Sequence, residues 1–162
     1  MQAELAGATA GFVATAPMTA AMELMHRMLP APERYPLPPR QIVDNGLNRM
    51  ESEGGVPGSD DASDEDVRAG GALAAHFGFG AMAGAAYGPI ARTRPSHPIA
   101  VGIGYGLMVW TTQYLGVLPA AGLLSNAAHH PARRNALMIA AHVVWGAALG
   151  AMAHRLVDRR AT

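Results

Sequence analysis

Residues 135–154 read NALMIAAHVVWGAALGAMAH, a run of twenty residues without Asp, Glu, Lys or Arg. At a rise of about 1.5 Å per residue, a helix of this length matches the ~30 Å hydrocarbon core of a bilayer. Further uncharged runs of 18 residues or more occur at 5–22, 69–91 and 95–132. Together the four runs predict an all-α fold, a four-helix transmembrane bundle that forms a single integral-membrane domain over residues 1–162.

The charged residues of the chain are few and segregated. They make up 15% of the sequence, against about 25% in soluble domains, and 14 of the 24 lie between Arg27 and Arg68. Basic and acidic residues balance at 12 each, which argues against nucleic acid as a partner. The alternative is an Ala- and Gly-rich soluble bundle, because Ala is nearly neutral on membrane-insertion scales.

The uncharged runs predict membrane helices at 5–29, 70–90, 99–124 and 136–157. Pro17 lies inside the first helix, where we expect a kink that Thr15 and Thr19 ease by bonding the freed carbonyl. No Lys or Arg precedes this helix, so we expect it to be retained rather than cleaved as a signal peptide. Four spans put both termini on one side of the membrane, and the arginine counts slightly favour the cytoplasmic side.

Residues 30–69 form the expected extramembrane loop. Apolar residues at roughly helical spacing predict a short amphipathic surface helix at 40–53, followed by a flexible linker at 54–59. An acidic cluster comes next, where Ser63 is a candidate N-cap of the second membrane helix. A helix start and cation binding both account for the acids, and we favour the helix start. The cluster consists of Asp60, Asp61, Asp64, Glu65 and Asp66.

Glycines recur at steps of four residues in every predicted membrane helix. Small residues at this spacing let two helix backbones approach closely, which is the main source of helix association in lipid. The alternative is chance scatter in a sequence rich in Ala and Gly. The glycines are Gly7 and Gly11, then Gly80, Gly84 and Gly88, then Gly102 and Gly106, and finally Gly146 and Gly150.

Polar residues share these glycine faces. His76 and His142 each precede a glycine of their own helix by four residues, and Gln113 follows Gly106 by seven. Counted from the predicted helix ends, these three residues and Glu23 lie ~9 to 10 Å below the membrane surface on the loop side. We therefore expect one intramembrane polar layer, made of Glu23, His26, His76, Gln113 and His142.

The segment YPLPPR at 35–40, the lone His76, Gln113 and the segment AHVVW at 141–145 together resemble the YagU-like inner-membrane proteins, a small bacterial family of uncharacterised function. The resemblance implies a multi-helix protein of the bacterial inner membrane and brings no reaction with it. The chain departs from the family in its shorter connection between the third and fourth helices and in its acidic loop.

Three roles suit the polar layer. Its members could set helix register through hydrogen bonds, pass protons or small cations, or bind a metal or haem through Glu23, His26, His76 and His142. Glu23 and His26 form one E-x-x-H pair, where di-iron bundles use two. His76 and His142 could ligate a haem if their helices face each other. No spacing demands a cofactor, and we expect none.

The remaining residues favour packing over chemistry. Met18, Met22 and Met25 are a stripe typical of helix packing. The aromatics Trp110, Tyr114 and Trp145 are expected at interfaces or in packing, and Arg133 and Arg134 as a flank that fixes topology. No nucleophile with a base, phosphate loop or zinc pattern is visible, so an enzyme is not favoured. We expect a structural or accessory role in the inner membrane, with a membrane-protein partner or a second copy of the chain; proton or cation handling is the alternative.

Overall fold

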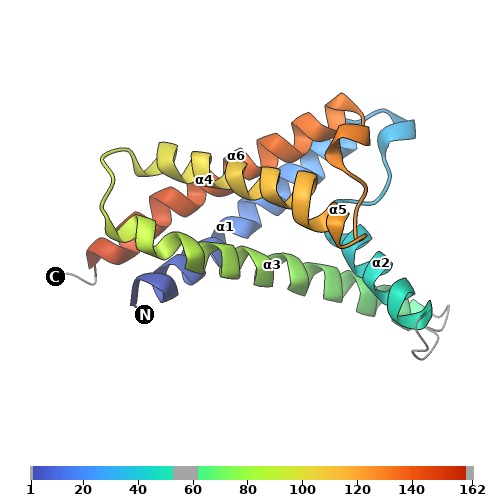
Figure 1. Ribbon diagram of the computed structural model, residues 1–162, viewed down its shortest axis with the longest axis horizontal. Helices are drawn as coiled ribbons and strands as arrows, with labels where there is room; N and C mark the ends of the chain where they lie inside the picture. The colour runs from blue at the N-terminus through green and yellow to red at the C-terminus, as the bar shows by residue number, and fades with distance from the viewer. Residues whose placement is uncertain (1, 53–61, 160–162) are drawn as a thin grey trace.

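The computed structural model describes residues 2–52 and 62–159, without the side chains of 50, 51, 62–64, 158 and 159 (Figure 1). The expected linker at 54–59 and the acids Asp60 and Asp61 lie outside the described residues. The described chain is all-α. Its elements are α1 (Gln2–Arg27), η1 (Ala31–Glu33), α2 (Pro38–Ser52), α3 (Ala62–Arg92), α4 (Pro98–Thr112), the π-helix η2 (Gln113–Val117), α5 (Leu118–Ala120), η3 (Ala127–His129) and α6 (Ala132–Arg159).

The helices α1, α3, α4 and α6 run alternately in opposite directions, so α1 begins and α6 ends at the same end of the molecule (Figure 1). The most extensive contacts join α1 to α3, α4 to α6 and α1 to α6. By contrast, α3 and α4 hardly touch. The bundle is therefore closed on three sides and open between α3 and α4.

Glycines lie where the paired helices cross. A Cβ on Gly11 would lie 2.8 Å from the Cα of Gly84, and a Cβ on Gly102 would lie 2.8 Å from the Cα of Gly150. Both distances are shorter than real Cβ contacts, so these backbones approach more closely than any larger residue allows. The glycine steps thus hold α1 against α3 and α4 against α6.

The ends of the helices differ from the predicted ones. Helix α3 begins at Ala62, eight residues before the expected start, so Ser63 lies in its first turn rather than before it. The helical path after α4 ends at Ala120, where Gly122 with a φ of +67° turns the chain. Helix α6 begins at Ala132, directly after Pro131, four residues before the expected start at 136.

Two helices, Gln2–Arg27 and Ala132–Val157, are long and apolar enough to cross a membrane, where the sequence predicted four. Their most apolar windows are 44% and 50% buried within the protein, and core helices of soluble proteins or an N-terminal signal sequence can have the same length and composition. Helix α4 by itself is 15 residues long, which is short for a span, but the helical path continues through η2 and α5 to Ala120.

Helix α1 continues through Pro17. The hydroxyl of Thr15 donates to the carbonyl of Gly11, and that of Thr19 donates to Thr15, each at 2.8 Å. The carbonyl that Pro17 deprives of its donor is that of Val13, four residues earlier. The two threonines therefore bond other carbonyls than the one we expected.

Candidate functional site

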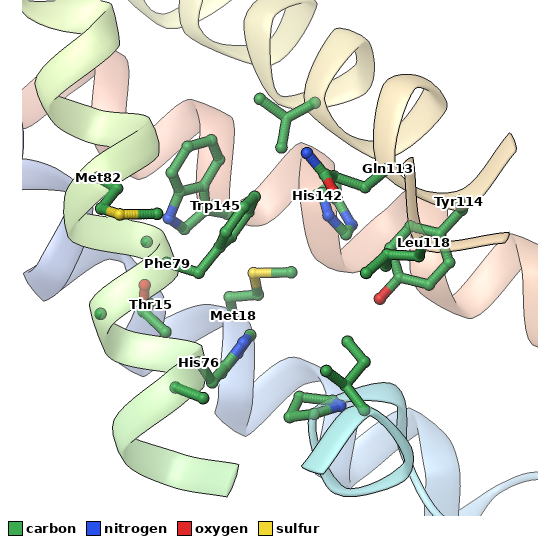
Figure 2. Close-up of a pocket in the computed structure, with 16 residues that line it drawn as sticks. Thr15, Met18, His76, Phe79, Met82, Gln113, Tyr114, Leu118, His142 and Trp145 are labelled. Carbon is green, nitrogen blue, oxygen red and sulfur yellow. The ribbon is translucent and has the colours of Figure 1, made fainter. Parts of the chain in front are cut away.

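A cavity of about 480 Å³ lies between α3 and α4, with α1 and α6 behind it and α2 across one end (Figure 2). Its wall is mostly apolar, and the described residues that line it include no Asp, Glu, Lys or Arg. Three members of the predicted polar layer, His76, Gln113 and His142, line it from three different elements. This cavity is the candidate site.

The two histidines of the cavity differ in their hydrogen bonds. The Nδ1 atom of His142 lies 2.8 Å from the carbonyl oxygen of Met138, one turn earlier in α6. A carbonyl only accepts, so Nδ1 carries the proton, and in the neutral ring Nε2 is then an acceptor. The Nε2 atom of His76 is buried and has no hydrogen-bond partner in the part of the chain that the structure describes. Both rings thus have a nitrogen available to a bound molecule.

Gln113 stands at the start of the π-helix η2, and Pro119 accounts for this wider turn. Proline has no N–H and its ring crowds the carbonyl four residues earlier, which is that of Leu115. The N–H of Leu118 instead donates to the carbonyl of Gln113, five residues earlier, which is the hydrogen bond of a π-helix. The side-chain nitrogen of Asn126 donates to the freed carbonyl of Leu115 at 3.4 Å. π-Helical turns occur frequently at functional sites.

Aromatic rings form much of the cavity wall. The ring of Tyr114 packs edge-on against His142, with 5.8 Å between centroids. The indole N–H of Trp145 donates to the carbonyl of Gly11 at 3.3 Å, which joins α6 to α1 and fixes the ring. Phe79 lies on the α3 side of the cavity (Figure 2). The sequence pattern indicated packing or interface roles for Tyr114 and Trp145 and gave no sign that they line a site.

Helix α2 closes one end of the cavity with Pro39 and Ile42. The guanidinium of Arg40 holds this helix in place, because it contacts Asp44 at 2.9 Å and both carboxylate oxygens of Glu65, at the start of α3, at 2.6 and 2.8 Å. The hydrogen bonds to both carboxylates raise the pKa of Arg40. At the other end of α2, Arg49 donates to the carbonyl of Ala121 at 2.7 Å.

The segment YPLPPR, which leads into α2, is held by contacts of Tyr35 and Pro36 with α6 and the loop before it. Arg134, only 3% exposed, donates to the carbonyls of Tyr35 at 3.0 Å and Pro36 at 2.6 Å, and its guanidinium lies 3.6 Å from the centre of the Tyr35 ring. The tyrosine hydroxyl contacts Nδ1 of His130 at 2.6 Å. Burial and the nearby charge of Arg134 lower the pKa of His130. Arg134 therefore anchors the YPLPPR segment, whereas the sequence suggested a charged flank.

The structure does not bring Glu23 and His26 into the cavity. The carboxylate of Glu23 accepts from Arg27 at 3.1 Å on an exposed surface of α1. His26 donates through Nε2 to the carbonyl of Tyr35 at 3.2 Å. Among the described residues, no three His, Asp or Glu side chains are grouped closely enough to hold a metal ion. Glu23 instead lines a second, smaller pocket of about 230 Å³ together with His76, so His76 borders both pockets while Glu23 and His26 lie outside the larger one.

Packing residues on α1 complete the cavity. Met18, 5% exposed, and Thr15, 1% exposed, line its floor, and Met22 is buried next to them. The methionine stripe is therefore part of the core, and one of its members reaches the site.

Comparison with known proteins gives the family of the chain and no function. No curated protein and no solved structure matches the sequence. The match to a protein family covers residues 31–151, which include α2, most of the cavity wall and the anchored YPLPPR segment. The chain belongs to this family, DUF1440, described as proteins of unknown function.

Proposed function

We propose that this chain is a small multi-pass protein of the bacterial inner membrane, with α1, α3, α6 and the continuous helical path 98–120 as its four spans, and that it is accessory to a membrane assembly. The motifs that resemble the YagU-like proteins support the inner-membrane location. The anchored segment at 35–40 and His142 both lie inside the family match.

The observation that carries the proposal is the distribution of large apolar side chains. Phe12 on α1, Met82 on α3 and Met108 on α4 are 50%, 67% and 53% exposed, whereas glycines form the closest contacts between the helices. A soluble protein buries its large apolar residues and rarely exposes them in contiguous patches. Large apolar side chains on the outer faces, with glycines where the helices cross, are what lipid surroundings favour.

Reporter fusions at three positions test the topology. Four spans predict that fusions at residue 162 and in the turn after Arg92 report one compartment, and that a fusion within 54–59 reports the other. If only α1 and α6 cross the membrane, the fusion in the turn after Arg92 should instead report the same compartment as the fusion within 54–59. The turn fusion therefore discriminates the two topologies. A chain that stays in the soluble fraction when the membranes are pelleted would refute both.

The accessory role is supported by the absence of a carboxylate from the described lining of the larger cavity. Glu23 shares a smaller pocket with His76, but its carboxylate is paired with Arg27. Purification in a mild detergent should then yield a stoichiometric membrane-protein partner. Proton or cation handling is the second candidate, because His76 and His142 border one cavity. Proton or metal flux into liposomes that contain only this protein would favour it and refute the accessory role.

A further inference from the structure

The size and lining of the cavity indicate an uncharged ligand. Its volume of about 480 Å³ lies within the ~300–1,000 Å³ of small-molecule sites. The described lining includes no charged side chain. A free ion or the carboxylates of a haem would find no opposite charge here, and burying an unpaired charge is costly.

The polar groups of the lining match oxygen atoms on the ligand. Nε2 of His142 is an acceptor, since Nδ1 bonds to Met138, and Nε2 of His76 is buried without a partner among the described residues. The amide of Gln113, which lines the same cavity, can both donate and accept. The carbonyl oxygens of a quinone can accept from the amide of Gln113 and from an Nε2–H of His76, and after reduction a hydroxyl can also donate to Nε2 of His142.

The wall and the mouth of the cavity restrict the ligand further. Phe79, Tyr114 and Trp145 offer ring surfaces, against which a flat ring packs favourably. Phe79 and Met82 also lie on the outer surface, 38% and 67% exposed, at the opening between α3 and α4. This inference rests on the proposed membrane location. In that location, a ligand that enters through this opening comes from the lipid.

We propose that the cavity between α3 and α4 binds a lipid-soluble quinone, with its ring between the aromatic side chains and its carbonyl oxygens bonded to His76 and Gln113; once the quinone is reduced, one of its hydroxyls donates to His142. The π-helical turn has a part in this site, because it carries both Gln113 and Tyr114 on the cavity wall.

The experiment uses decylubiquinone as the probe and the fluorescence of Trp145 as the readout. The chain has two tryptophans, so the variant Trp110→Phe, in detergent, leaves Trp145 as the sole reporter. Saturable quenching is expected. A cavity-filling variant, Gly78→Leu, should weaken binding at least ~10-fold, because Gly78 lines the cavity and a Cβ there meets nothing within 4 Å.

Matched variants make the result specific. Gly104→Leu adds the same side chain at an equally open glycine away from the cavity and should leave the Kd unchanged. His76→Leu should weaken binding about fivefold through a lost hydrogen bond, whereas His97→Leu, at an exposed histidine, should not. Thermal unfolding of each variant verifies that it is folded.

Three outcomes would overturn the inference. They are quenching that does not saturate, equal quenching in Gly78→Leu and the parent, and a haem absorption band in the purified protein. Because binding is measured in detergent, it is independent of the fusion and fractionation tests. A chain with the proposed topology that fails to bind the quinone refutes this inference alone, and a soluble chain that binds it refutes the proposed membrane location alone.

Discussion

Replacing Gly84 by alanine tests how α1 and α3 are held together. A Cβ at this position would lie 2.7 Å from the Cα of Gly11 and 2.9 Å from its nitrogen, whereas ordinary contacts of a Cβ begin at 3.4 Å. The shortfall of about 0.7 Å falls on backbone atoms. Backbone atoms cannot rotate away as a side chain can, so the two helices must move apart.

The cost follows from this separation. A gap of ~0.5–1 Å forfeits a quarter to a half of the dispersion energy across a contact, and overpacking of this kind costs about 1–3 kcal/mol. The upper value applies at Gly84, because both sides of the contact are backbone. The higher helix propensity of alanine offsets ~1 kcal/mol of this loss in stability. The free energy of unfolding should therefore fall by ~2 kcal/mol, or about 4–8 °C in Tm for a chain of this size.

Thermal unfolding in a mild detergent, followed by circular dichroism, measures this difference. Gly104→Ala is the matched control, because Gly104 is exposed in α4 and a Cβ there meets nothing within 4 Å. Its Tm should stay the same or rise by a few degrees. Equal Tm values for the two variants would refute the close backbone contact as the cause of stability.

Three further changes test the end of the bundle near Tyr35 and the π-helical turn. Arg134→Gln should lower the free energy of unfolding by ~2 kcal/mol, because it removes charged hydrogen bonds to the carbonyls of Tyr35 and Pro36; the exposed Arg133→Gln should not, and equal losses in denaturant titrations would contradict the anchoring role. The lowered pKa of His130 means that the unfolded chain binds the proton more readily, so stability should fall as the pH drops from its ordinary value near 6.5 through the folded value. His130→Gln should make the dependence of Tm on pH less steep, and an unchanged slope would count against this assignment. Asn126→Ala should cost ~1 kcal/mol by leaving the carbonyl of Leu115 unpaired, and an unchanged Tm would show that this bond does not support the turn.

Part of the candidate site could be predicted from single helices. His76, Gln113 and His142 share helix faces with glycines, and all three border the cavity. The depth of Glu23 in the membrane was predicted by counting residues from the expected helix ends. Such a count takes no account of Arg27, one turn further along α1, which forms an ion pair with the carboxylate of Glu23 at the surface. The predicted depths of His76 and His142 also change, because α3 begins eight residues and α6 four residues earlier than predicted.

The π-helical turn and the role of Arg134 needed the folded chain. Pro119 in the sequence indicates a disturbed hydrogen-bond ladder, but only the fold brings the side chain of Asn126, in the next loop, to the freed carbonyl of Leu115. Arg134 is 99 residues from Tyr35 in the sequence. Its flanking position and charge suggested an exposed residue, and only the packing of the YPLPPR segment against α6 makes it a buried anchor.

The sequence by itself determined the all-α class, the approximate positions of the long helices and the glycine faces on which they meet. These features depend on composition and on a period of about four residues, both of which act within one helix. Only the tertiary structure decided which helices pair, where the cavity opens and which polar residues reach it. The physical reason is that these properties depend on contacts between distant segments, such as the carbonyl of Gly11 with Trp145 and that of Tyr35 with Arg134, which no local pattern encodes.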